Sequence, residues 1–522
     1  MILKHFLKTS AATMLSRIFG LVRVILEAKF LGGGSVASAW LLAFAIPNTF
    51  RRILGEGALG NALVPFITHN IEEHGRKNTR YDLAAIFVLL SFVLITISIF
   101  ISGIAWLAQP YVTVARYRLM LQLLPLLMPY VIFICLTGAF SSILSTLRIF
   151  ALPALTALLL NISIIGCLLL IGYYSLGYDS NAECVSNYIS PKVLDYLAIS
   201  VLFAGFVQLL IIIFIVYRKG MLPIISRQAL KHRQAIITVT KLTIPTAISG
   251  GAIQLSTLID KGIASAIGPM AVPALAYSDR IVLLPVGVLG VTLGSILLSS
   301  MSTDAAKGNI ASMVRTIEMS LKTMLLICIP IALFTVLFRH DIISLLYERG
   351  AFTSENANAT AYAMLFYATG IPFFVCLKIL TPAFSARKDM MTPFKVTLFC
   401  LILNTVLNLI LMFPLQQGGI ALATVISSLV NNCLLIFLLR RSGINIRVTP
   451  LLIAIFKSMI ACVIALFAAS VLELYLVPDY NVGDPHSIFP IRLIVNVAIF
   501  VVSYLGILAL LVKRSEFMAK RG

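Results

Sequence analysis

The sequence contains few charged residues, and acidic residues are the scarcer kind. Only 11% of its 522 residues are charged, and 20 Asp and Glu stand against 40 Lys and Arg. A soluble domain has about 25% charged residues, whereas 60% of the residues here are hydrophobic. This composition excludes an ordinary soluble protein and predicts an all-α protein that crosses a membrane many times.

Common signatures of catalysis, metal binding and disulfide bonding are also missing. The sequence has no DxD, HExxH or G-x-x-x-x-G-K-[ST] motif and no CxxC spacing, and its six histidines are scattered. A transferase acting on a lipid phosphate would need a positioned base or a carboxylate cluster that binds a metal. All cysteines except Cys184 lie in apolar runs, which argues against a disulfide framework. We therefore do not expect an enzyme.

Long apolar runs occupy nearly the whole chain. A helix needs about 20 apolar residues to span the hydrocarbon of a bilayer. We find fourteen such runs between breaks that contain Pro, Gly or basic residues. The sequence therefore predicts fourteen transmembrane helices.

The Lys and Arg residues, which give a net charge of +20, concentrate in alternate loops. Such asymmetry orients a membrane protein with its basic loops inside, so both termini are expected in the cytoplasm. Anionic membrane lipids are suitable partners for these loops. Nucleic acid is not an expected partner, because the basic runs contain no interleaved aromatic residues that could stack on bases.

Basic breaks and weak repeats predict how the helices are grouped. Breaks near 218–241 and 440–450 divide the chain into residues 1–225, 226–445 and 446–522. Segments 148–161 and 387–404 each join a basic residue and a proline to an apolar run, and similar motifs surround Pro47 and Pro285 at nearly the same offset. We predict two pseudo-symmetric six-helix lobes followed by two extra helices, a plan typical of transporters that work by alternating access.

Arginines stand inside several apolar runs. Arg17 and Arg23 lie in the first, Arg51 and Arg52 in the second, and Arg280 in the eighth. Each costs about 2.5–3.5 kcal/mol near the bilayer centre on insertion scales, so it should face water, a partner or an anionic ligand. Guanidinium groups bind phosphate oxygens bidentately. The sequence thus predicts a cationic cavity that accepts an anionic substrate.

An alternative is that these arginines form structural ion pairs, with Glu27 and Glu56 as the nearest acidic residues. This alternative is strongest for Arg23 and Arg52. In the second run, Pro47 and the glycines of the GEG sequence that contains Glu56 predict a kinked helix that exposes backbone carbonyls to a cavity.

A second set of polar residues lies at membrane depth. Asp260, Asn404, Asn408, Thr424 and the carbonyl of Ile420 provide one carboxylate and several neutral oxygens. This combination suits a monovalent cation, so Na⁺ is a possible bound ion and no other cofactor is expected. The alternative is that these groups only hydrogen-bond neighbouring helices to one another.

Five segments together resemble the MurJ/MviN family of lipid II flippases, in the MOP exporter superfamily. They are SRIFGLVR (16–23), PNTFRRILGEGALGNALVPF (47–66), AYSDRIVLLPVGVLGVTLGSILLSSMS (276–302), LLYERGAF (345–352) and FSARKDMMTPFK (384–395). The resemblance covers essentially the whole chain. An exporter of lipid-linked oligosaccharides or drugs from the same superfamily is the alternative.

The resemblance implies a function and a set of substrate-binding residues. It implies a monomer in the bacterial cytoplasmic (inner) membrane that moves lipid II, an undecaprenyl-diphosphate-linked precursor, from the inner to the outer leaflet for peptidoglycan and cell-wall synthesis and cell shape. Helices thirteen and fourteen would form a groove for the lipid tail. With Arg52 added from the argument above, the substrate-binding residues are Arg17, Arg23, Arg51, Arg52, Glu56, Arg280 and Lys378.

Two departures from the family pattern concern acidic residues. Positions that are often acidic in the family hold Ser38 and Leu283 here. The cavity is therefore expected to be more positive than usual, and neither position can carry a proton on a carboxylate.

Overall fold

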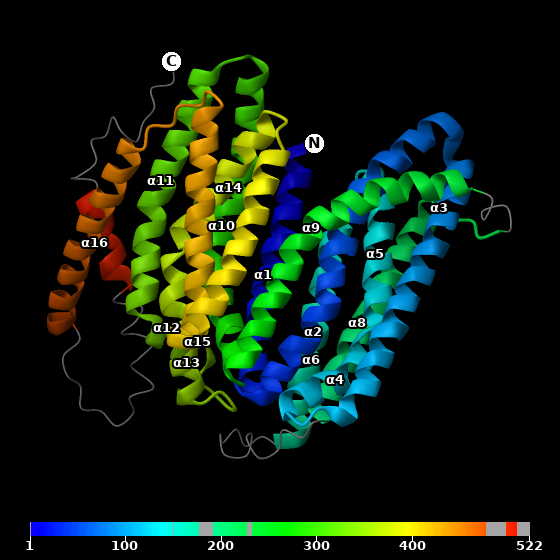
Figure 1. The fold of residues 1–522 in the computed structure, drawn as a ribbon, viewed down its shortest axis with the longest axis horizontal. Coiled ribbons are helices and arrows are strands. Elements are labelled where there is room, and N and C mark those ends of the chain that lie inside the picture. Colours follow the sequence, from blue (N-terminus) through cyan, green and yellow to red (C-terminus); the bar gives the residue numbers. More distant parts are fainter. Residues whose placement is uncertain (1, 150, 177–191, 227–231, 477–496, 509–522) are drawn as a thin grey trace. The chain divides into compact units, whose positions relative to one another are not determined.

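The computed structural model describes residues 2–149, 151–176, 192–226, 232–476 and 497–508. Every regular element among these residues is a helix, which confirms the all-α prediction (Figure 1). The elements are α1 (Ile2–Leu31), α2 (Ser35–Phe50), η1 (Arg51–Ala58), α3 (Leu59–Ala108), η2 (Gln109–Tyr111), α4 (Ala115–Leu127), α5 (Pro129–Thr146), α6 (Ala151–Leu176), α8 (Lys192–Arg218), α9 (Arg233–Ile267), α10 (Ala271–Ala306), α11 (Ile310–Leu337), α12 (Arg339–Tyr347), α13 (Ser354–Thr369), α14 (Ile371–Ala386), α15 (Met391–Arg441), α16 (Thr449–Leu476) and a short apolar helix, Val497–Leu508.

The helices are long and apolar enough for a protein that spans a membrane repeatedly. Within the described residues, seven have the length and hydropathy to cross, or up to nine if two bent pairs each count as one span. Two long stretches are interrupted by non-helical residues, Gly75 in α3 and Gln416 in α15. The multi-span helical class is confirmed, whereas the count of fourteen stays a prediction.

Two compact units are defined by contacts along the chain. The first comprises Met1–Ala274 with Tyr347–Asn356, and the second comprises Leu275–Leu346 with Ala357–Gly522. Contacts group elements that pack together in one conformation, not elements that move together. The division into lobes at residue 225 and the separate 446–522 pair therefore stay predictions.

The core of the first unit is built around α5. This helix packs against both α3 and α8, and a second cluster joins α1, α2, α4, α6 and α8. Aromatic side chains contribute to both clusters, with Phe87 and Phe140 in ring contact at 4.4 Å in the first. Fully buried members of the two clusters include Leu63, Leu83, Ile143 and Ile212 in the first and Trp40, Tyr130 and Leu197 in the second.

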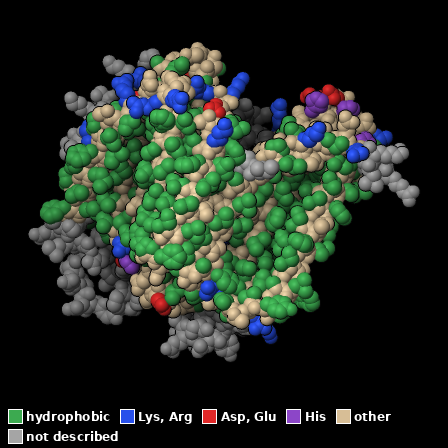
Figure 2. Space-filling model, viewed as in Figure 1, with side chains coloured by type: hydrophobic (Ala, Val, Ile, Leu, Met, Phe, Trp, Pro, Cys, Tyr) green, Lys and Arg blue, Asp and Glu red, His purple; other side chains and the backbone are tan. Residues whose placement is uncertain are grey.

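Many large apolar side chains also lie on the outside of the helices. Phe92, Ile99 and Trp106 on α3 are each 68% exposed. Figure 2 shows hydrophobic side chains covering most of the visible face, with Lys and Arg gathered at its margins. In water such a surface would be costly, but in a bilayer apolar side chains belong against lipid tails. The distribution is that of a membrane protein.

A π-helical segment, which the sequence did not predict, begins four residues after Pro47. Residues Arg51–Ala58 form η1, which continues α2 and leads directly into α3. A π-helical turn has one extra residue per hydrogen-bonded ring, and such turns are frequent at functional sites. The segment packs against α5 where two glycines meet: a Cβ on Gly138 would lie 2.7 Å from the Cα of Gly55. Only glycine fits at this contact.

Replacing Gly138 with alanine is therefore expected to destabilise the first unit. The added methyl group must push α5 and η1 apart, a form of overpacking that typically costs about 1–3 kcal/mol. Thermal unfolding of the detergent-purified protein measures the effect. The control is Gly103→Ala, since a Cβ at Gly103 meets no atom within 4 Å. Equal melting temperatures for the two variants would contradict the proposed tight contact.

Polar contacts fix the segment between α8 and α9 to the middle of α3, just after its break at Gly75, where the acidic residue Asp82 lies. The Nδ1 atom of His232 lies 2.7 Å from one Asp82 oxygen, and Asn70 donates to the other at 2.9 Å. The Arg80 Nε donates to the Leu222 carbonyl at 2.7 Å. These bonds set where α9 begins, and α9 then packs along α3 and η1.

In the second unit, α11 is the helix against which the C-terminal helices pack. It contacts α14 and α16. The Tyr504 hydroxyl, on the 497–508 helix, donates to the Leu326 carbonyl of α11 and lies 2.9 Å from Ser458 Oγ of α16. Phe334 and Phe500 add a ring contact at 5.7 Å. The described part of residues 446–522 is therefore a packed extension of this unit.

Candidate functional site

The structure places the two arginines of α1 in different environments. Arg23 is 9% exposed, and its Nε lies 3.6 Å from Glu27 Oε1, which also accepts a hydrogen bond from Trp40 Nε1 at 3.3 Å. Arg17, two turns earlier, is only partly buried. Arg23 thus forms the ion pair that the alternative describes, and Glu27 links α1 to α2 through Trp40.

The adjacent arginines of η1 point to different neighbours. Arg51 is partly buried and donates from Nε to Asn48 Oδ1 at 3.0 Å. Arg52 is exposed and donates to Gln254 Oε1 on α9 at 3.4 Å. Successive residues of a helix point in different directions, so the pair does not share one face. The side chain of Glu56 lies outside what the structure describes.

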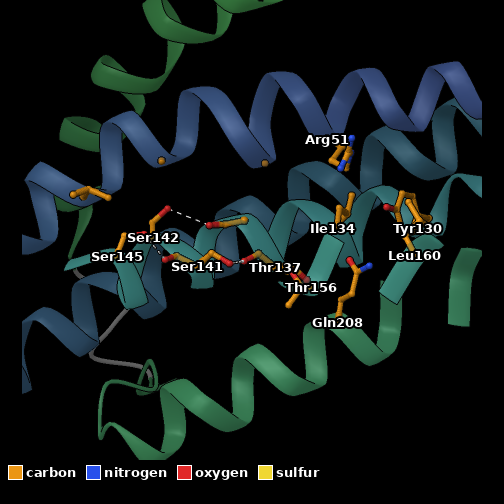
Figure 3. Close-up of a pocket in the computed structure, with 14 residues that line it drawn as sticks. Arg51, Tyr130, Ile134, Thr137, Ser141, Ser142, Ser145, Thr156, Leu160 and Gln208 are labelled. Carbon is orange, nitrogen blue, oxygen red and sulfur yellow. Dashed lines mark hydrogen bonds between the residues drawn. The ribbon is translucent and has the colours of Figure 1, made fainter. Parts of the chain in front are cut away.

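Arg51 lines a cavity inside the first unit (Figure 3). The cavity has a volume of about 340 Å³ and is lined by residues of η1, α3, α5, α6 and α8. Its polar lining residues are Arg51, Tyr130, Thr137, Ser141, Ser142, Ser145, Thr156 and Gln208. Of these residues, only Arg51 was predicted from the sequence to bind a ligand. The four-residue spacing of Thr137, Ser141 and Ser145 places them on one face of α5, and this spacing could have indicated a polar surface.

In the second unit, Arg280 and Lys378 are both exposed. Lys378 lies on α14, where its methylene groups press on α10: a Cβ on Gly290 would lie 2.9 Å from Lys378 Cγ. Similarly, a Cβ on Gly294 would lie 3.2 Å from the backbone carbonyl oxygen of Lys378. Small residues on α10 therefore let the lysine lie flat along the helix and leave its ammonium group accessible.

Four of the five possible sodium ligands come together on α15. Asn408 donates to Asn404 Oδ1 at 3.2 Å, Asn404 donates to Thr424 Oγ1 at 3.4 Å, and Thr424 donates to the Ile420 carbonyl at 3.1 Å. Asn404, Asn408 and Ile420 are buried. Asp260 belongs to α9 in the other compact unit. In this arrangement the four residues bond to one another as contacts between the two halves of α15.

The FSARKDMMTPFK segment forms the connection from α14 to α15. Lys388 adopts a left-handed conformation with φ of 62°, and Asp389 accepts a hydrogen bond from the Thr392 amide at 3.0 Å. Hydrogen bonds from the side chain and amide of Thr392 hold the pKa of Asp389 below its usual range. The motif thus ends one helix and caps the next. Its role here is structural.

Comparison with known proteins identifies the family. The family model described as lipid II flippase MurJ matches residues 27–492. The chain belongs to the MurJ family. A probable lipid II flippase MurJ of Rhizobium tropici is 32% identical over 85% of this chain and 81% of its own length. The lipid II flippase MurJ of Burkholderia cenocepacia is 29% identical over 84% of each chain.

Solved structures agree with this assignment. A structure titled lipid II flippase MurJ, inward closed conformation, matches with a TM-score of 0.76 and 25% identity, covering 95% of this chain and 97% of the other. An inward-facing multidrug transporter of the MATE family in the MOP superfamily matches with a TM-score of 0.66 and 16% identity over 84% of this chain and 98% of the other. The second likeness extends to the fold alone.

Removing either member of the Arg23–Glu27 pair is expected to destabilise this MurJ-family protein. Breaking a buried ion pair leaves one uncompensated charge and typically costs about 3–5 kcal/mol. We expect Arg23→Ala and Glu27→Ala to lower the melting temperature in detergent, and the double variant Arg23→Met/Glu27→Leu to recover part of the loss. Arg17→Ala, on the same helix, is the control. A loss as large in the control would contradict a specific ion pair.

Proposed function

We propose that this protein flips lipid II, the undecaprenyl-diphosphate-linked peptidoglycan precursor, from the inner to the outer leaflet of the bacterial cytoplasmic membrane. The family match over residues 27–492 carries this proposal. The protein would serve cell-wall biogenesis and cell shape as a monomer with both termini in the cytoplasm. Transport of this kind needs no covalent chemistry, so we assign no enzymatic reaction.

The diphosphate is the part of this substrate that a membrane interior tolerates least. We propose that Arg17, Arg51, Arg52, Arg280 and Lys378 bind it while alternating access exposes it to one leaflet and then the other. The guanidinium groups of the arginines supply paired N–H donors that match two phosphate oxygens at once. The ammonium group of Lys378 would contribute a positive charge without this paired geometry. Arg23, committed to Glu27, would act mainly by holding α1 in place.

The lipid tail has a separate place in this proposal. Helix α16 and the 497–508 helix pack on α11 and carry large apolar side chains on their outer surfaces. Phe456 and Val502 are 68% and 71% exposed. We propose that these helices guide the polyprenyl chain, so that it can remain in the hydrocarbon while the head group crosses.

Alanine substitutions at Arg17 and Arg280 are expected to slow flipping without loss of folded protein. Charge-assisted hydrogen bonds contribute about 1.5–3 kcal/mol each, roughly a 10- to 150-fold effect on affinity. Arg→Lys should restore only part of the activity, because the charge remains but the paired donors are lost. Lipid II flipping in proteoliposomes measures the effect, with exposed Arg76→Ala as the control. Folded Arg17→Ala and Arg280→Ala proteins that flip at wild-type rates would contradict diphosphate binding by these residues.

We also propose that Na⁺ binds through Asp260, Asn404, Asn408, Ile420 and Thr424. The oxygen chemistry of this set fits a monovalent cation, although binding requires the hydrogen bonds among the α15 residues to rearrange. Asp260→Ala should abolish a sodium-specific rise in melting temperature, measured against potassium. Asp195→Ala, at the start of α8, should leave it intact. A sodium response that persists in Asp260→Ala would leave the α15 residues as helix contacts only.

A further inference from the structure

Gln208 lies on α8 inside the first unit and has no role in the diphosphate binding proposed for the arginines. Its side chain is 1% exposed, and neither its amide nitrogen nor its oxygen has a hydrogen-bond partner among the described residues. The amide points into the cavity that Arg51 also lines (Figure 3). A buried amide without hydrogen-bond partners destabilises the fold, so the presence of a glutamine at this place calls for a ligand or water that binds it.

The hydroxyl groups opposite Gln208 supply the complementary chemistry. Thr137, Ser141, Ser142 and Ser145 each donate their proton to the carbonyl four residues earlier on α5, at 2.7–3.1 Å. With the proton committed, each hydroxyl oxygen offers lone pairs to the cavity. Gln208 offers two N–H donors and one carbonyl acceptor. The lining therefore both accepts and donates hydrogen bonds while carrying no charge along this stretch.

Charge is confined to one part of the cavity. Among the described residues that line it, Arg51 is the one with a formal charge. A positive group without a lining carboxylate disfavours a bound cation and favours an anionic group at that position. The ligand that fits is anionic at one end and bears neutral hydroxyl or amide groups along the rest.

The volume restricts the ligand further. About 340 Å³ corresponds to roughly eleven waters at bulk density, and it is near the lower limit of about 300–1,000 Å³ for small-molecule sites. That space suits one sugar ring with a phosphate. A polar cavity of this size cannot be assumed dry, so water is the competitor that a ligand must displace.

We propose that this cavity binds the sugar phosphate portion of the substrate, with phosphate at Arg51 and the ring hydroxyls and acylamino group at Gln208 and the α5 hydroxyls. This inference rests on the proposed function, because it assigns the site to the first sugar and phosphate of a polyprenyl-diphosphate-linked precursor. It adds Gln208 and the α5 hydroxyls as specificity determinants, none of which is a charged residue.

Binding of N-acetylglucosamine 1-phosphate to the full-length protein in neutral-lipid nanodiscs tests the site directly. We expect saturation-transfer NMR to detect the probe on the wild-type protein, and Gln208→Leu to weaken binding about tenfold or more. Ser141→Ala, which removes one acceptor and little volume, should weaken it severalfold and guards against misfolding of the leucine variant. Thr335→Val is the matched control, because Thr335 makes the same type of bond to Ile331 outside the cavity. It should change nothing.

Three results would overturn the proposal. Inorganic phosphate that binds as well as the sugar phosphate would reduce the site to an anion site. If the probe does not bind at any concentration up to its solubility limit, the cavity holds only water. If Gln208→Leu binds the probe as the wild-type protein does and has a higher melting temperature, then Gln208 does not contact the ligand and only destabilises the fold.

Flipping assays separate this proposal from the proposed function. If the wild-type protein does not flip lipid II in proteoliposomes, the proposed function fails. If it does flip, and Gln208→Leu and Ser141→Ala leave the half-saturating lipid II concentration unchanged, then only the sugar-phosphate site fails. A raised half-saturating concentration in both variants, with Thr335→Val unaffected, supports the site.

Discussion

A polar group within the hydrocarbon of a bilayer finds no water, so the protein itself must satisfy it, and this constraint governs how the chain carries its polar residues. The hydroxyl groups of α5 donate hydrogen bonds to backbone carbonyls one turn earlier. Asn404 and Asn408 bond to each other and then to Thr424. Arg23 forms an ion pair with Glu27, which also accepts a hydrogen bond from the indole nitrogen of Trp40. Polar groups that the protein does not satisfy in this way are then the ones most informative about ligands.

The π-helical segment η1 shows how backbone irregularity positions two of those groups. The close approach of Gly55 to Gly138 brings η1 against α5, which forms one wall of the cavity lined by Arg51. Arg52, the next residue, contacts α9 instead. The two adjacent arginines therefore have different neighbours, as expected for successive residues of any helix.

Shared architecture does not by itself set the substrate. The MATE transporter and this chain have a similar fold at 16% identity, and folds of this size serve many cargoes. The substrate must therefore be argued from the arginines and neutral polar groups that this chain places on that architecture. The proposed function depends on those side chains, whose chemistry matches a diphosphate and its attached sugar, and on the family to which they belong.

Composition and motifs are properties of the chain alone, so the helical membrane class, the family and the arginines within apolar runs could be predicted from the sequence. Glu27 could also be placed one turn from Arg23, since four-residue spacing is local. The structure was needed to show that Trp40 joins this pair, that η1 is π-helical, and that Gln208 lines the same cavity as the α5 hydroxyls. Helical periodicity fixes which residues share a face, but the face that meets another helix depends on packing between segments distant in sequence.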